Sequence, residues 1–176
     1  TVFALRGGID NFTLDSCTVS GTPTANSSAN YAIIYGSGSV TRNFTVNGST
    51  FNDGGWGIDL SGYNTTITST NSQVTNSPFN NQDYAGIFLQ YQSDVVTTGN
   101  TITNPVSRGI ELQYCYGSSQ VLKNKITAVN NGVGIYIYYC TGGTGFPTGP
   151  GLVANNFVQG VSSISGIAVY TCNYQN

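Results

Sequence analysis

Three side chains of this chain have the types and spacing needed for acid–base chemistry. Asp59 and Glu111 occupy the same place in a recurring Gly-Ile phrase, and Arg108 lies three residues before Glu111. Two carboxyl groups held at a fixed separation can act as general acid and general base on a glycosidic bond. The chain has no histidine, which excludes Ser-His-Asp and Cys-His nucleophile systems and His-based metal sites. The catalytic candidates are therefore Asp59, Glu111 and Arg108.

The recurring phrase determines where these side chains would lie. It reads Gly-Ile, then any residue, then another apolar residue, at spacings of 23 to 32 residues, in segments 57–60, 86–89, 109–112, 134–137 and 166–169, with a looser copy at 32–35. On a β-strand the two apolar side chains would point inward and the residue between them outward. Repeats of this period indicate a solenoid, in which each coil buries its apolar face against the next.

A second repeated pattern accompanies each phrase. A small polar residue is followed two positions later by an apolar one, which aligns a polar and an apolar column: Cys17, Ser49, Ser72, Asn100, Asn124 and Asn156, then Val19, Phe51, Val74, Ile102, Ile126 and Val158. The asparagines could hold a ligand, or they could form a buried ladder that satisfies backbone groups at a bend. Because buried polar groups need partners, we favour a structural ladder for Asn100, Asn124 and Asn156.

These phrases resemble the repeats of right-handed parallel β-helix proteins, the pectate-lyase-like superfamily. The segments Val-x-x-x-Asn-x-Ile and Gly-Ile-x-Leu carry the resemblance, which covers nearly the whole chain. It implies an all-β, right-handed parallel β-helix of about six coils, with residues 1–176 forming one domain, either part of a longer solenoid or a stacking subunit. The superfamily includes lyases, hydrolases, epimerases, phage tailspikes, adhesins and filaments, so the resemblance leaves the activity open.

Aligning the coils separates the candidate acids. Asp59 and Glu111 fall in one column two coils apart, which places their backbones ~9.6 Å from each other, near the upper limit for an inverting carboxylate pair. Phe88 lies between them and would crowd that space. A lyase similar to the calcium-dependent members of the superfamily would need a compact acidic cluster beside a base such as Arg108, and we find no such cluster. We therefore expect no cofactor and no metal site, and calcium is a candidate cofactor only under the lyase alternative.

Three cysteines share one position in the repeat. Cys115, Cys140 and Cys172 each lie six residues after the glycine of their phrase. Successive coils should stack them ~4.8 Å apart, within the Cα range that a disulfide tolerates. One disulfide could join Cys140 to either neighbour, or the three thiols could form a buried column of small apolar side chains. A linear column does not suit the tetrahedral geometry of zinc.

The outward positions of the Gly-Ile strands would form a long face of aromatic and amide side chains. It would hold Phe88, Gln90, Gln113, Tyr136, Tyr138 and Tyr170. Sugar rings stack on aromatic rings and hydrogen-bond to amides, and tyrosines also suit contact with another protein chain. Ordinary cross-strand stacking of aromatic rings is the third interpretation.

Composition limits the partners and the location. Because 7% of residues are charged and the net charge is −2, nucleic acid is not an expected partner, and no apolar run is long enough for membrane insertion. The chain contains no Met and little Lys, and it carries glycosylation sequons at Asn11, Asn26, Asn43, Asn47 and Asn64. We expect an extracellular or cell-surface protein, glycosylated only if its host has the machinery.

Neither end of the sequence shows an amphipathic cap helix, the element that usually blocks edge pairing in a parallel β-helix. Copies could then stack end to end, so self-association is the expected partnership and a polysaccharide the second. The sequence predicts an extracellular structural or adhesive module that forms filaments by stacking. The alternative is a fragment of a polysaccharide lyase or hydrolase, or a glycan-binding domain like that of a tailspike.

Overall fold

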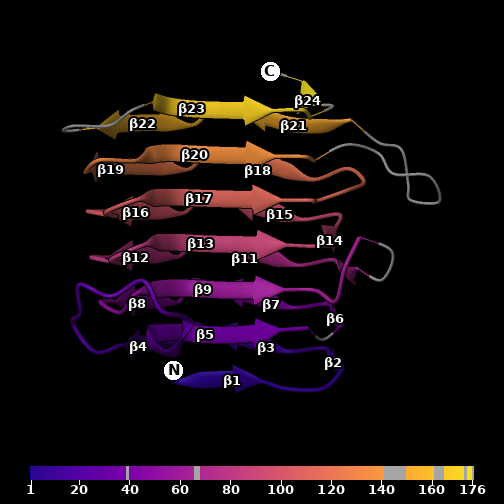
Figure 1. Ribbon diagram of the computed structural model, residues 1–176, viewed down its shortest axis with the longest axis horizontal. Helices are drawn as coiled ribbons and strands as arrows, with labels where there is room; N and C mark the ends of the chain where they lie inside the picture. The colour runs from indigo at the N-terminus through magenta and orange to yellow at the C-terminus, as the bar shows by residue number, and fades with distance from the viewer. Residues whose placement is uncertain (39, 66–67, 141–149, 161–164, 173, 176) are drawn as a thin grey trace.

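The computed structural model describes residues 1–38, 40–65, 68–140, 150–160, 165–172 and 174–175. Its strands wind into a solenoid whose coils lie one above another from the N-terminus to the C-terminus (Figure 1). Apart from one 3-10 helix, η1 (Ala29–Tyr31), the described residues form strands, turns and bends. None of them forms a helix with the length and apolar character that a membrane crossing requires. Neighbouring strands pair in parallel, so the predicted all-β parallel β-helix is confirmed.

Four parallel sheets line the solenoid. The first, here called the long-strand sheet, contains β1 (Phe3–Leu5), β5 (Ala32–Ser37), β9 (Trp56–Ser61), β13 (Ala85–Gln90), β17 (Arg108–Gln113), β20 (Val133–Tyr138) and β23 (Ser165–Tyr170). The second contains β2 (Ile9–Asp10), β6 (Thr41–Arg42), β10 (Ser69–Thr70) and β14 (Gln92–Ser93).

The other two sheets complete each coil. The third contains β3 (Thr13–Asp15), β7 (Thr45–Asn47), β11 (Gln73–Thr75), β15 (Val96–Thr98), β18 (Gln120–Leu122), β21 (Gly151–Ala154) and β24 (Tyr174–Gln175). The fourth contains β4 (Thr18–Ser20), β8 (Thr50–Asn52), β12 (Pro78–Asn80), β16 (Thr101–Thr103), β19 (Lys125–Val129) and β22 (Phe157–Gly160). Sheets of seven and six strands are close to the six coils that the sequence predicts.

The core fills the inside of the coils. The apolar residues of the Gly-Ile phrase stack in register, so that Ile58 pairs with Ile87 and Leu60 with Leu89 on the next coil, and all four are buried. The glycine of the phrase is required by this packing. A Cβ atom at Gly109 would lie 2.6 Å from the carbonyl oxygen of Gly134 and under 3 Å from the side chain of the buried Ile126 on the fourth sheet.

Gly109→Ala is expected to lower the free energy of unfolding by about 1–3 kcal/mol, because the added methyl overpacks the core. Gly166 occupies the same place in the last phrase, but a Cβ there would meet Val158 at 3.9 Å, an ordinary contact. Gly166→Ala should therefore change stability by less than about 0.5 kcal/mol. Urea denaturation of both variants measures the difference, and equal losses would show that crowding at Gly109 is not the cause.

A buried polar ladder lies at the turn between the third and fourth sheets. The backbone N–H of Ser77 donates to Asn100 Oδ1 (3.0 Å), that of Asn100 to Asn124 Oδ1 (3.0 Å), and that of Asn124 to Asn156 Oδ1 (2.9 Å). The amide of Asn124 also donates to the carbonyl oxygen of Thr97 (2.9 Å). These asparagines are therefore engaged by the backbone of the solenoid itself.

The ladder contains Ser77 where the sequence alignment places Ser72, so that part of the alignment is wrong. The N–H of Ser49 donates to Ser77 Oγ (3.1 Å), and Phe79 takes the apolar place two residues later. Ser72 lies one turn earlier, where its hydroxyl bonds to Gln92 Oε1 (2.8 Å). Both serines are followed two positions later by an apolar residue, so only the strand pairing shows which of them belongs to the ladder.

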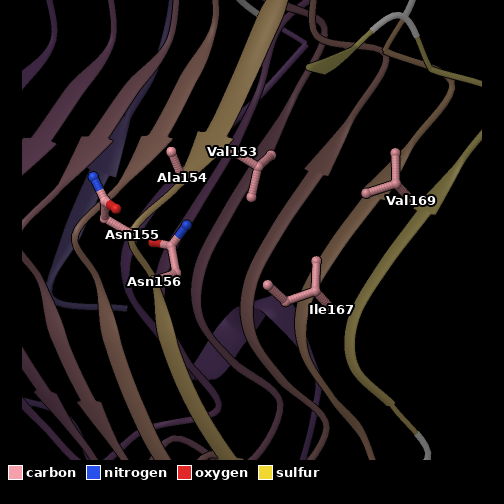
Figure 2. A pocket seen from close by; sticks show the side chains of 6 residues that line it. All are labelled: Val153, Ala154, Asn155, Asn156, Ile167 and Val169. Carbon is pink, nitrogen blue, oxygen red and sulfur yellow. The ribbon is translucent and has the colours of Figure 1, made fainter. Parts of the chain in front are cut away.

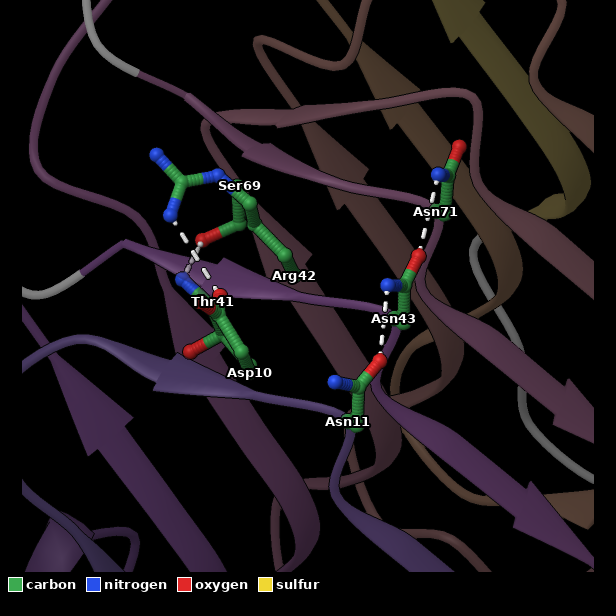
Figure 3. A network of polar contacts seen from close by, with 7 residues as sticks. All are labelled: Asp10, Asn11, Thr41, Arg42, Asn43, Ser69 and Asn71. Atoms are coloured by element: carbon green, nitrogen blue, oxygen red, sulfur yellow. Dashed lines mark hydrogen bonds and ion pairs between the residues drawn. The ribbon is translucent and has the colours of Figure 1, made fainter.

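Exposed asparagines form another ladder at the turn between the second and third sheets (Figure 3). Asn43 Nδ2 donates to Asn11 Oδ1 (2.9 Å), and Asn71 Nδ2 donates to Asn43 Oδ1 (3.1 Å). All three residues have positive φ, from 54° to 63°, a backbone region that asparagine tolerates better than most residues. Beside them Arg42 pairs with Asp10 at 3.3 Å. The exposed ladder therefore fixes the turns of successive coils.

The cysteine column contains no disulfide, because all four cysteines are free. The N–H of Cys115 donates to Cys140 Sγ (3.3 Å), and the N–H of Cys140 donates to Cys172 Sγ (3.2 Å). The disulfide interpretation of Cys115, Cys140 and Cys172 is therefore wrong. The thiols stack in register as the asparagines do, and each sulfur is engaged by backbone groups. Burial raises the pKa of the Cys140 thiol, which keeps it in the unreactive thiol form.

Candidate functional site

The outward side chains of the long-strand sheet, here called the outer face, gather the residues that the sequence identifies. The central column from β9 to β23 reads Asp59, Phe88, Glu111, Tyr136 and Ala168. The next column reads Ser61, Gln90, Gln113, Tyr138 and Tyr170. The strand register thus brings every candidate contact residue onto one continuous surface.

Both carboxyl groups of this face are buried, although they point outward. Glu111 is 2% exposed and Asp59 is 7% exposed. Gln90 Nε2 donates to Gln113 Oε1 (2.9 Å), and Gln113 Nε2 donates to Glu111 Oε1 (2.6 Å). Glu111 is therefore the end of a chain of hydrogen bonds that runs across two coils.

Burial raises the pKa of both carboxyl groups. The pKa of Asp59 rises from 3.8 to about 6, because of burial first and repulsion from Glu111 second. Burial also raises the pKa of Glu111, although the hydrogen bond from Gln113 and the charge of Arg108 oppose the rise. The face therefore holds a proton on Asp59 closer to neutral pH than a solvated aspartate would.

Arg108 lies beside Glu111 without forming an ion pair with it. Its guanidinium carbon is 4.8 Å from the ring centroid of Tyr136, a cation–π arrangement. Its Nη1 donates to the carbonyl oxygen of Ser107 (2.9 Å). Arg108 Nε and Glu111 Oε2 are buried without a hydrogen-bond partner, as are Thr41 Oγ1, Gln82 Oε1 and Thr98 Oγ1 elsewhere among the described residues. Buried polar atoms of this kind usually have partners, and here a donor and an acceptor on the same strand of the outer face both lack one.

Sequence reasoning missed two aromatic residues of the site, Trp56 and Tyr84. Their ring centroids lie 4.1 Å apart, and Trp56 also lies 5.2 Å from Phe88. Trp56 occupies the strand position directly before the glycine of its phrase, the same position that Arg108 takes two coils later. The signal was present, since Trp56 is the single tryptophan of the chain.

A row of tyrosines borders the outer face at the following turn. Tyr91 stacks on Tyr114 with ring centroids 5.2 Å apart, and Tyr114 stacks on Tyr139 at 5.7 Å. Each has a φ near 50°, an uncommon backbone for a bulky residue. Tyr138 of the outer face meets Tyr139 edge to face at 4.5 Å. The row therefore extends the aromatic surface beyond the strands.

This arrangement can stack a ring and hydrogen-bond its polar groups. Phe88 lies between Asp59 and Glu111, as the sequence predicts, so the backbones of the two acids are two strand spacings, ~9.6 Å, apart. No three His, Cys, Asp or Glu residues gather as a metal site within the described part of the chain. The chemistry available from the described side chains is proton transfer by carboxyl groups, hydrogen bonding by amides and stacking by aromatic rings.

The sequon asparagines lie away from the core. Asn11, Asn26 and Asn43 are exposed, and Asn47 and Asn64 are half-buried. The amides of Asn43 and Asn47 donate to side chains on the preceding coil, at 2.9 and 2.8 Å. A glycan attached to the amide nitrogen of Asn43 or Asn47 must therefore be compatible with that hydrogen bond. Asn26, by contrast, lies in the segment between β4 and η1, which has no regular secondary structure.

Comparison with known proteins agrees with this architecture. A family model described as "Right handed beta helix region" matches residues 5–175, which span the repeats from β1 to β24. Neither the curated proteins nor the solved structures yielded a match. The extent of the family match and the parallel solenoid together show that the chain belongs to the right-handed β-helix family.

Proposed function

We propose that this protein is an extracellular β-helix module that binds a glycan along its outer face. The observation that carries the proposal is the combination, on one face, of half-buried aromatic rings with half-buried amides and a buried carboxyl. Phe88 and Tyr136 offer flat apolar surfaces, while Gln90, Gln113 and Glu111 offer amides and a carboxyl. A sugar ring uses both, because its C–H surface stacks on aromatic rings and its hydroxyls bond to polar groups. Low charge and exposed sequons support a location outside the cell.

Phe88→Ala is expected to weaken glycan binding about tenfold, because one lost stacking contact of about 1.4 kcal/mol corresponds to that factor. Phe157→Ala is the matched control, since Phe157 is 55% exposed on the fourth sheet, away from the outer face. It should bind as the parent does. A glycan array followed by calorimetry measures both. Binding to no glycan, or equal losses in the two variants, would contradict the proposal.

Turnover of the bound glycan would make this face an active site. Asp59, with a pKa of about 6, can hold a proton near neutral pH, as a general acid must. A polysaccharide panel assayed with and without calcium separates binding from turnover. Glu111→Gln and Asp59→Asn then assign any turnover to the carboxyl pair or exclude it.

A second function, end-to-end self-association, is supported by the exposed apolar side chains of β23. Ile167 is 44% exposed and Val169 40% exposed, although their partners on the previous coil, Ile135 and Ile137, are fully buried. The two residues help to line a pocket of about 490 Å³, with Val153, Ala154, Asn155 and Asn156 opposite (Figure 2). Residues 126–176 contain no charged side chain. An apolar surface of this kind suits contact with another chain.

The first coil of a second copy has apolar residues at the matching positions. Phe3 pairs with Ile34 and Leu5 with Gly36, in the columns that continue through the sheet to Ile167 and Val169. A copy stacked in register would place Phe3 over Ile167 and continue the parallel sheet. Such a head-to-tail contact repeats without closing, so it builds a filament.

Ile167→Asp is expected to weaken self-association of the 176-residue chain at least about tenfold, because it places a charge in an apolar contact. Gln159→Asp adds the same charge at an exposed outward position on β22 and should have little effect. Sedimentation velocity and electron microscopy measure the assembly. A strictly monomeric short rod at high concentration would rule out the filament.

A further inference from the structure

We propose that the outer face selects an uncharged glycan, and that Arg108 and Glu111 together bind one of its hydroxyl groups. This inference rests on the proposed glycan function and names the substrate class of the same face. Two buried atoms without partners carry it, the donor Arg108 Nε and the acceptor Glu111 Oε2. Glu111 as a residue is 2% exposed.

The two atoms belong to residues of one strand that both neighbour Tyr136 on the next coil. Arg108 and Glu111 are both residues of β17. The guanidinium carbon of Arg108 lies 4.8 Å from the ring centroid of Tyr136, and Tyr136 is the register partner of Glu111 on the next strand. The remaining carboxyl oxygen of Glu111 is already occupied by Gln113 (2.6 Å). A donor and an acceptor without partners therefore lie on one strand, and the charge of Arg108 acts on Glu111.

Only certain ligand groups can satisfy both atoms. A hydroxyl can accept from Arg108 Nε and donate to Glu111 Oε2 at the same time. A carboxylate only accepts, so it would leave Glu111 Oε2 without a donor, and an ammonium only donates, so it would leave Arg108 Nε without an acceptor. A buried group left unpaired costs about 1–3 kcal/mol. The pair therefore favours a neutral hydroxyl.

The charged side chains on the face also favour a neutral sugar over an acidic one. Asp59 and Glu111 lie in one column, and the nearby Arg108 is the cation that acts on Glu111. A uronate would add a third acidic group beside two buried carboxyls, and the charge of Glu111 already disfavours ionisation of Asp59. A neutral sugar adds no charge to this group.

Entry of the hydroxyl requires a covering side chain to move, because Arg108 Nε and Glu111 Oε2 have no solvent access in the unliganded protein. Tyr136 is half-buried and its ring lies against Arg108. Rotation of this ring would uncover the guanidinium and leave the ring available for stacking on the sugar. Tyr136 is therefore the side chain that we expect to change rotamer on binding.

The test uses matched pairs of glycans. Neutral glucan, galactan and mannan oligosaccharides are compared with the same chains after oxidation of C6 to the uronate, by calorimetry near pH 7.5. The neutral member of the bound pair should bind at least about tenfold more tightly. Equal or tighter binding of the uronate would overturn this inference and leave the proposed glycan function standing. Binding to none of these chains would remove both.

Two variants assign the selectivity to its residues. Glu111→Gln removes a charge but keeps an acceptor oxygen, so the preference for the neutral chain should shrink severalfold. Arg108→Lys keeps the charge but loses the Nε donor, so affinity for the neutral chain should fall about tenfold. An unchanged preference in Glu111→Gln, or full affinity in Arg108→Lys, would overturn the assigned roles. Thermal unfolding of each variant confirms that the solenoid is intact.

Discussion

Asn124→Ala is expected to lower the free energy of unfolding by about 3–5 kcal/mol, since several buried groups lose their partners at once. Asn124 Oδ1 accepts from both the backbone N–H and the side-chain amide of Asn100, each at 3.0 Å. Its own amide donates to the carbonyl oxygen of Thr97 (2.9 Å). Alanine can form none of these bonds, and Asn124 is nearly fully buried, so water cannot replace them easily.

Asn71→Gly is the matched control for this loss. Asn71 also belongs to an asparagine ladder, donating to Asn43 Oδ1 at 3.1 Å, but it is exposed. Its φ of 57° suits glycine, so the variant should lose less than about 1 kcal/mol. Urea denaturation followed by circular dichroism measures both variants. Similar losses at Asn124 and Asn71 would mean that burial does not decide the strength of the ladder.

Asp59→Asn is expected to stabilise the protein at pH 8 by up to about 3 kcal/mol. The pKa of Asp59 is about 6 in the folded protein against an ordinary value of 3.8, and each pKa unit corresponds to about 1.4 kcal/mol. Because the folded state holds the proton more tightly, the free energy of unfolding falls as the pH rises from about 4 to about 6, and the loss is complete above that window. Asparagine carries no charge at any of these pH values, so the free energy of unfolding of the variant does not fall for this reason.

The internal control for Asp59→Asn is its convergence with the parent protein below pH 4, where Asp59 is protonated in both the folded and the unfolded chain. Glu111, whose pKa is also raised, should leave a residual pH dependence of the same sign in the variant. Denaturation curves from pH 3.5 to pH 8 measure both effects. A variant that is less stable than the parent at pH 8 would show that the Asp59 carboxylate is stabilised in the fold.

Several features could be predicted from the sequence because the residues that form them recur at the same place in each coil. The columns through Ile58 and Leu60 follow from a phrase that recurs in order, and the stacking of Cys115 on Cys140 follows from counting six residues after each glycine. The identity of the ladder serine could not be predicted this way, because Ser72 and Ser77 fit the same pattern. The role of Trp56 was also missed, because no other coil repeats it.

The sequence by itself determined the solenoid, the inward and outward residues of its long strands, and the sharing of one column by Asp59 and Glu111. These properties depend on the order and spacing of the repeated phrases, which can be seen directly in the sequence. Only the tertiary structure decided that the two carboxyls are buried, that the thiols stay unbridged, and that Arg108 Nε and Glu111 Oε2 lack partners. These properties depend on how side chains from different coils pack and hydrogen-bond across about 5 Å, and residues 20 or more positions apart in the chain set those contacts.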